Sequence, residues 1–246
     1  MLSDEKTNIS SIADEIKRDQ VLSANVLRLC NSSYLSLPRK IASIDQAIVY
    51  LGSKILIQMI ITAQTEKIFR GREHGYSLSR GGMYHHCLAV ARLCERLAKV
   101  HGGIAPDIAY TAGLLHDIGK VVLDQHIADV QPFFYRTIYD QNADSSVLER
   151  EMFGIDHCQT GLLLTEKWEL PDIIKDAILF HHSPGMAEDN REIVNLVYLA
   201  DVFTDRFLAG LEIEKINSAD LEESMELLHL EPRNIYEHLS VLAESF

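Results

Sequence analysis

One short apolar stretch with two polar residues inside it most constrains what this chain can fold into. The stretch reads GLLHDIGK over residues 113–120, and it places His116 and Asp117 side by side in a helical pattern that would otherwise be buried. Burying either polar group costs several kcal/mol unless the group is hydrogen-bonded, paired with a charge or bound to a metal. The stretch therefore predicts that partners for both side chains come from elsewhere in the chain.

Other histidines and one aspartate lie in similar apolar helical contexts far away in the sequence. They are His86, His157, His181, His182 and Asp201. Imidazole and carboxylate ligands together suit zinc, iron or manganese rather than calcium. A single buried histidine is more often a hydrogen-bonded core residue than a ligand, but that explanation weakens when it must cover five histidines and two aspartates. We therefore predict that these residues form one metal site together with His116 and Asp117.

The two central residues and a nearby lysine leave some roles open. His116 and Asp117 are neighbours, so on a helix their side chains diverge by about 100°. Both could ligate one ion, or Asp117 could bridge two ions while His116 binds one. Lys120 follows His116 by four residues and lies on the same helical face, where it would contact a substrate phosphate or neutralise an inner carboxylate. The histidines that are not predicted as ligands are His74, His85, His101, His126, His229 and His238.

The composition limits the kinds of partner and compartment. The chain has 246 residues and a formal net charge of -13, which argues against a nucleic-acid partner. Its four cysteines form no CxxC pair, and we interpret them as small buried hydrophobes in a reducing cytosol. The longest apolar run is too short to span a bilayer, and the first residues lack a secretory pattern. The sequence predicts a cytoplasmic protein without a membrane partner, and it leaves the oligomeric state open.

Helical periodicity runs through almost every segment, and no stretch alternates convincingly as a strand. The predicted fold class is therefore all-α. The polar segment 71–82 is the best internal boundary and divides the chain into 1–75 and 76–246. The expected helices cover residues 19–30, 43–52, 53–69, 83–101, 106–117, 128–139, 145–153, 156–169, 171–182, 191–208, 218–228 and 232–245, with a connector at 37–40.

The two helices expected on either side of Gly52 resemble a helix-turn-helix. The second of them offers only Lys54 and Lys67 as cations, and its Leu56 and Met59 belong to an apolar face that needs burial. Two antiparallel core helices are therefore favoured over a DNA-binding motif.

The order of the candidate ligands resembles that of a known family. Four of them follow the H…HD…D pattern of the HD superfamily of metal-dependent phosphohydrolases. The further histidine and the histidine pair resemble the dinuclear branch of that superfamily, which includes the HD-GYP cyclic-dinucleotide phosphodiesterases. The resemblance implies two divalent ions, with iron or manganese favoured over zinc or nickel. It assigns His86, His116 and Asp201 to one ion, His157, His181 and His182 to the other, and Asp117 to the bridge between them.

The front half resembles the HDOD domain, a bacterial signalling module related to HD proteins. The resemblance covers roughly residues 8–208 and implies an N-terminal helical HDOD subdomain at 1–75, followed by an HD-like metal-binding helical bundle at 76–246. It rests on Asp19, LRLCNS at 27–32, Ile44, QAI at 46–48, LG at 51–52, the block 154–171 and HHSP at 181–184.

Two features depart from the HD-GYP pattern. The residues after His182 read SPGMAEDN without a GYP motif, which argues against hydrolysis of cyclic-di-GMP. Gly82 stands where some HD-GYP sites carry a glutamate for a third ion, so a dinuclear site is favoured. Since the chain begins close to the expected start of an HDOD domain, we expect a preceding helix or an upstream sensory or receiver domain to lie outside it.

The leading functional hypothesis is metal-assisted hydrolysis of a phosphate ester or nucleotide. Two ions would lower the pKa of a bridging water and clamp the phosphoryl oxygens, with Asp117 and Lys120 as the catalytic residues. One alternative is a non-catalytic signalling module with a protein partner and a structural or sensing metal site. Another is oxidation at a di-iron centre, which some HD proteins perform. No nucleotide-binding motif is visible, so the sequence does not identify the substrate.

Overall fold

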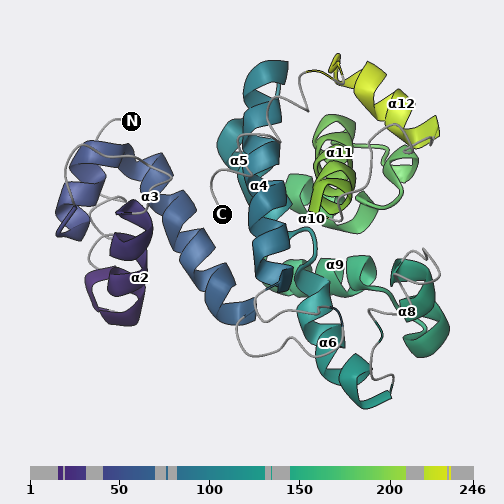
Figure 1. The fold of residues 1–246 in the computed structure, drawn as a ribbon, viewed down its shortest axis with the longest axis horizontal. Coiled ribbons are helices and arrows are strands. Elements are labelled where there is room, and N and C mark those ends of the chain that lie inside the picture. The colour runs from purple at the N-terminus through teal and green to yellow at the C-terminus, as the bar shows by residue number, and fades with distance from the viewer. Residues whose placement is uncertain are drawn as a thin grey trace. The chain divides into compact units, whose positions relative to one another are not determined.

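The computed structural model describes residues 16–18, 20–31, 41–69, 76, 82–130, 134, 145–208, 219–231 and 233. The regular elements among these residues are helices, and no described residue forms a strand, which confirms the all-α fold class. None of the described helices has the length and apolar character of a membrane span. The α-helices are α2 (Gln20–Cys30), α3 (Ile44–Phe69), α4 (Gly82–His101), α5 (Pro106–Leu115), α6 (Ile118–Val130), α8 (Ser145–Phe153), α9 (His157–Lys167), α10 (Asp172–Phe180), α11 (Arg191–Leu208) and α12 (Ala219–Leu227), with a 3-10 turn, η1, at Pro184–Met186 (Figure 1).

The chain divides into two compact units between Lys67 and Ile68. Most of the predicted boundary segment at 71–82 lies outside the described residues, as do Asp19, the connector at 37–40 and most of the predicted last helix. The division at residues 75 and 76 into an HDOD part and a metal-binding part therefore stays a prediction.

The first unit is built from α2 and α3, which share one hydrophobic core. Leu56 and Met59 are buried in that core, as expected for a core helix. The predicted start of α3 is confirmed, because the Ser43 hydroxyl accepts a hydrogen bond from the Gln46 N–H at 3.2 Å. The predicted helix break is also confirmed, because Gly52 interrupts α3 with φ 77° and ψ 168°. Essentially only glycine adopts this backbone conformation.

We expect Gly52→Ala to lower the free energy of unfolding by about 1–3 kcal/mol. An added Cβ would meet no atom within 4 Å, so the cost comes from the backbone conformation rather than from a clash. Thermal denaturation followed by circular dichroism measures the change. The matched control is Gly185→Ala, whose Cβ also meets open space but whose φ lies outside the left-handed region. Equal stability of the two variants would contradict the prediction.

The second unit is a bundle in which neighbouring helices pack in pairs. Helix α4 packs against α5 and α11, α6 packs against α9, and α10 contacts α5, α9 and α11. The buried face of α4 consists largely of small residues such as Cys87, Ala91 and Ala98, which allows close contact with its neighbours. Gly102, with φ 78°, follows the last residue of α4, as the sequence predicted. Figure 1 shows α4 and α5 side by side.

The sequence predicted one helix through His116 and Asp117, and this was wrong. Helix α5 ends at Leu115 and α6 begins at Ile118, so the two polar residues form the turn between the helices. The Lys120 N–H donates to the Asp117 carbonyl oxygen at 2.9 Å, a three-residue spacing that tightens the backbone here. Because the apolar residues continue on both sides of the turn, their periodicity did not reveal the break.

A second helix prediction was wrong at its start. The sequence placed a new helix at 128–139, but Ala128 belongs to α6, which runs on to Val130. Most of the remaining residues of that prediction lie outside the described part of the chain. By contrast, the predicted bounds of α8 and α11 agree with the structure.

Two glycines allow α6, α9 and α10 to approach one another closely. A Cβ on Gly119 would lie 1.9 Å from the carbonyl oxygen of His157 and 2.7 Å from the nitrogen of Gly161. A Cβ on Gly161 would lie 2.7 Å from Cγ2 of Ile178 on α10. Since His157 opens α9 and Asp117 directly precedes α6, this close contact brings the two side chains together.

Candidate metal centre

All seven predicted ligands lie in the second unit, and the structure brings their polar atoms together. Six of the seven are buried or nearly so at helix ends or in turns, where a side chain can reach a common point. Their positions are His86 in the first turns of α4, His116 and Asp117 between α5 and α6, His157 at the start of α9, His181 and His182 after the end of α10, and Asp201 on α11.

Four donor atoms surround what we call the first position. His86 Nε2 lies 3.3 Å from His116 Nε2 and 3.0 Å from Asp201 Oδ1. His116 Nε2 lies 3.4 Å from Asp201 Oδ1 and 3.4 Å from Asp117 Oδ2. Ligands that bind one ion at about 2.1 Å are separated by roughly 3.0–3.4 Å in octahedral or tetrahedral geometry. The spacing of these atoms therefore fits a single metal ion.

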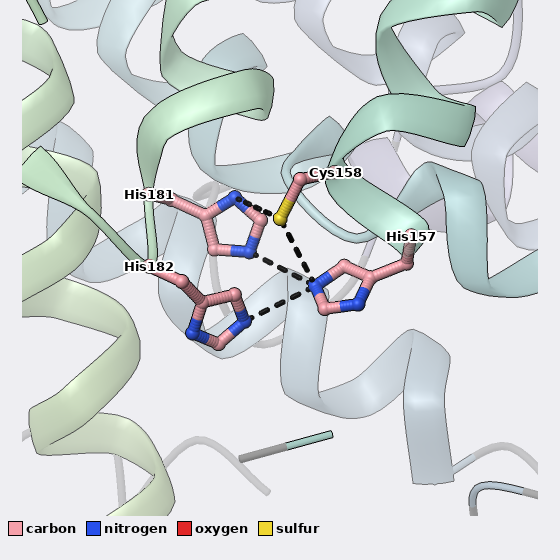
Figure 2. A group of neighbouring side chains, drawn as sticks. All are labelled: His157, Cys158, His181 and His182. Carbon is pink, nitrogen blue, oxygen red and sulfur yellow. Dashed lines mark hydrogen bonds between the residues drawn. The ribbon is translucent and has the colours of Figure 1, made fainter. Parts of the chain in front are cut away.

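Four further donor atoms surround the second position. His157 Nε2 lies 3.3 Å from His181 Nε2 and 3.1 Å from His182 Nε2. Asp117 Oδ1 lies 3.4 Å from His157 Nε2 and 3.6 Å from His181 Nε2. Figure 2 shows the three imidazole rings pointing toward one another from α9 and from the end of α10. This set has the same spacing as the first.

Asp117 lies between the two positions and presents one oxygen to each. Oδ2 faces the first position and accepts a hydrogen bond from Lys120 Nζ at 2.7 Å. Oδ1 faces the second position and is buried without a hydrogen-bond partner among the described residues. An unpaired buried carboxylate oxygen is costly, and a cation at the second position would satisfy it. The residues present thus fit two divalent ions bridged by one carboxylate.

Backbone carbonyl groups orient two of the histidines. His116 Nδ1 lies 2.8 Å from the carbonyl oxygen of Gly113, and His181 Nδ1 lies 2.8 Å from that of Ile178. Only an N–H can pair with a carbonyl oxygen, so Nδ1 carries the proton in both rings. Nε2 then faces the centre with a free lone pair, as it does in metal-bound histidines.

Carboxylates orient two more histidines in the same way. His157 Nδ1 lies 2.7 Å from Oε2 of Glu149 on α8, and His86 Nδ1 lies 3.1 Å from Oδ1 of Asp205 on α11. Glu149 also accepts the backbone N–H of His157 at 2.6 Å. A carboxylate on the outer nitrogen of a ligand histidine makes the ligand more basic. Each position thus has one histidine that is supported by a carboxylate.

The electrostatics of the centre reflect a high density of carboxylates. Burial would lower the pKa of His116, but the carboxylates of Asp117 and Asp201 raise it to about 9. Asp205 and Asp201 likewise raise the pKa of His86 well above its usual value against the effect of burial. In a protein without metal, protons on these rings supply part of the positive charge that divalent ions would bring.

Three residues of the centre were missed by the sequence-based prediction. Glu149 is fully buried, and burial raises its pKa to about 7, yet its charged neighbours in the sequence are typical of an exposed helix face. Asp205 follows Asp201 by four residues, a spacing that places both on one helix face and could have revealed it. Cys158 was interpreted as a core hydrophobe, and it is buried, but its Sγ lies 3.5 Å from His157 Nε2.

The histidines that were not predicted as ligands lie away from these contacts where the structure describes them. His85, His126 and His229 are exposed, and His101 is half-buried. The two others, His74 and His238, lie outside the described residues.

Comparisons with solved structures agree on the fold. An HDOD domain protein of unknown function from Geobacter sulfurreducens is 31% identical, with a TM-score of 0.70 over 94% of this chain and 75% of that chain. A candidate phosphohydrolase from Shewanella amazonensis is 24% identical, with a TM-score of 0.75 over 95% of this chain and 82% of that chain. The second likeness shows the fold alone.

Curated relatives match this chain over part of their length. An uncharacterized protein from Treponema pallidum is 24% identical over 205 residues, which are 82% of this chain and 39% of that protein. Ribonuclease Y from Ureaplasma parvum is 31% identical over 136 residues, which are 55% of this chain and 21% of the enzyme. The chain thus spans about two fifths or less of the relatives described here.

The family comparison covers most of the sequence. The model of the HDOD domain matches residues 1–184, which include the first unit, α4 to α10 and six of the seven predicted ligands. Together with the solved structure from Geobacter sulfurreducens, this match shows that the chain belongs to the HDOD domain family.

Proposed function

We propose that this protein is a metal-dependent phosphohydrolase that binds two divalent ions and hydrolyses a phosphate ester or nucleotide. The observation that carries the proposal is the position of Asp117, whose two oxygens face two separate sets of histidine nitrogens. A structural metal site in a protein commonly surrounds one ion and closes it off. Two adjacent positions that share a carboxylate are typical of enzymes that act on phosphoryl groups.

The chain's own residues would divide the work of hydrolysis among them. When bound, a pair of divalent ions supplies an activated water and neutralises charge on the phosphoryl oxygens. Asp117 would fix the separation of the two positions, and the carboxylates of Glu149 and Asp205 would hold the rings of His157 and His86 in place. Lys120 places its ammonium group beside Asp117, where it would attract a phosphate oxygen and stabilise the charge that develops there.

The substrate class follows from charge and similarity. The segment shared with Ribonuclease Y supports a phosphodiester as the bond that is cleaved. The net charge of -13 disfavours a long nucleic acid, so we propose a small phosphorylated compound or nucleotide. We favour iron or manganese as the metal, with zinc and nickel as alternatives for the same nitrogen and oxygen ligands.

A second candidate function is a signalling module that binds metal without turnover. The contact between Lys120 Nζ and Asp117 Oδ2 favours it, because this lysine already neutralises a carboxylate and is not free to bind phosphate. In that case the centre would sense metal or a ligand, and a protein partner would respond.

Metal analysis and turnover assays on the same samples separate these functions. The full chain is purified without chelator, and iron, manganese, nickel and zinc are measured by mass spectrometry. The protein is then assayed with bis(p-nitrophenyl) phosphate, nucleotides and cyclic dinucleotides. We expect two ions per chain and turnover that a chelator removes, with both lost in His116→Ala and His157→Ala and kept in the exposed control His126→Ala. Bound metal without turnover would favour the signalling module, and absence of metal would overturn both proposals.

The two carboxylates behind the ligand histidines predict effects that are specific to one position each. We expect Asp205→Asn to weaken binding at the first position by about 10- to 100-fold, and Glu149→Gln to do the same at the second. The reason is that each supports one ring, His86 or His157. Stepwise titration with Mn²⁺, followed by electron paramagnetic resonance, resolves the two affinities. Each variant is the control for the other, and equal weakening of both positions by either variant would contradict the prediction.

A further inference from the structure

The second position has a sulfur atom beside its nitrogen and oxygen donors. Cys158 Sγ lies 3.5 Å from His157 Nε2, and it lies within 4.8 Å of one nitrogen from each of His157, His181 and His182. In a tetrahedral site with metal–sulfur and metal–nitrogen bonds of about 2.3 and 2.0 Å, sulfur and nitrogen are separated by roughly 3.5 Å. Figure 2 shows the sulfur directed toward the same space as the three rings. The distance to His157 therefore fits a shared ion.

The surroundings of Cys158 give the sulfur no other evident purpose. The side chain is 4% exposed and forms no disulfide, so it is protected from solvent beside the three rings. It occupies the second residue of α9, where the positive end of the helix dipole favours a thiolate. The contact with His181 Nδ1 is 3.9 Å, and that nitrogen already donates to the carbonyl of Ile178.

An independent observation also points to a ligand at this position. Asp117 Oδ1 is buried, lacks a hydrogen-bond partner among the described residues, and faces His157 and His181. The orphaned oxygen and the sulfur thus lie by the same histidine nitrogens, on separate elements of the fold.

We propose that Cys158 is a direct thiolate ligand of the second metal position, so that this position selects a thiophilic ion such as Zn²⁺ over Mn²⁺. The inference rests on the proposed two-ion centre and adds a donor that the histidine and aspartate pattern does not contain. The first position offers only nitrogen and oxygen donors, whereas the second adds sulfur. Soft thiolate ligands favour zinc, and carboxylate and water ligands suit manganese. The two positions would therefore hold different metals.

The chemistry of ligation is a simple exchange of a proton for a metal ion. A bond forms between Sγ and the ion, the S–H bond breaks, and the proton leaves to solvent. No electron is transferred, so the step needs no oxidant or reductant.

Cobalt substitution tests the inference directly, because a thiolate bound to Co²⁺ gives a charge-transfer band in the near ultraviolet. The full chain is loaded with Co²⁺, and the spectrum is recorded with the metal content of the same sample. We expect the band in the unmodified protein and in Cys30→Ala, a buried cysteine in the first unit, and its loss in Cys158→Ser. X-ray absorption on the zinc-loaded unmodified protein is expected to show a zinc–sulfur distance of about 2.3 Å. This last measurement does not depend on the folding of any variant.

Metal competition gives a second readout. Loss of an outer partner of a ligand weakens binding by about 10- to 100-fold, so loss of a direct ligand in Cys158→Ser is expected to weaken Zn²⁺ binding at least tenfold while leaving Mn²⁺ binding nearly unchanged. Bound cobalt without a sulfur band, or a band that persists in Cys158→Ser, would overturn the assignment of Cys158 and leave the two-ion centre standing. Failure to bind any cobalt or zinc would instead count against the proposed function.

Discussion

Asp117→Asn is expected to abolish tight metal binding at both positions and, with it, hydrolysis of any phosphate ester. The substitution keeps the shape of the side chain but removes its negative charge and replaces one ligand oxygen by an NH₂ group. Since Oδ1 faces the second position and Oδ2 faces the first, neither position keeps its full set of donors. We expect affinity at each position to fall by more than about 100-fold, at the upper end of what loss of a supporting partner alone costs.

The measurement is metal content after dialysis, combined with turnover at saturating metal. The control is Asp172→Asn, which makes the same chemical change at an exposed residue of α10 that pairs with Lys175. Circular dichroism shows whether both variants keep their helices. A properly folded Asp117→Asn protein that retains both ions would show that the carboxylate does not bridge them.

Gly119→Ala is expected to have the largest effect on stability, at about 3 kcal/mol or more of lost free energy of unfolding. The new methyl group would lie 1.9 Å from the carbonyl oxygen of His157, and that atom belongs to the backbone of α9 and cannot rotate away. Helices α6 and α9 must therefore move apart, which also draws His157 away from Asp117. For a domain of this size the loss corresponds to a fall in Tm of roughly 6–12 °C.

Thermal denaturation and metal titration of the same variant test both parts of this expectation. Gly185→Ala adds the same methyl group where no atom lies within 4 Å, and it is expected to change neither property. If Gly119→Ala kept normal stability and normal metal binding, the close approach of α6 and α9 would not be a requirement of the fold.

Much of the helical architecture could be predicted from local sequence signals. Proline, glycine and capping residues mark helix ends, and they placed the ends of α4, α9 and α11 within a residue or two. The break between α5 and α6 could not be predicted in this way. The apolar residues on both sides of His116 and Asp117 continue one periodic pattern, and neither residue is a helix breaker. The chain turns there because the centre requires the two side chains to face it.

The ligand residues could be named from sequence because each is a metal-ligating residue type in an apolar setting. Their supporting groups carry no such signal. Glu149 lies in the charged segment LEREMF, and only the fold of α8 against α9 buries it behind His157. Gly119 likewise reads as an ordinary weak point in a helix, and its role depends on the distance to another helix. Cys158 has the composition of a core residue, and its role depends on which way the sulfur points.

The donor atoms of the centre come from segments that extend from α4 to α11 and so span most of the second unit. Joining points that far apart along a chain removes more entropy from the unfolded ensemble than joining close neighbours does. An ion held there would act as a clasp on the whole bundle rather than on one loop. A cell short of metal would then contain a looser form of this domain, and a protein that recognises only the tight form could respond to the shortage.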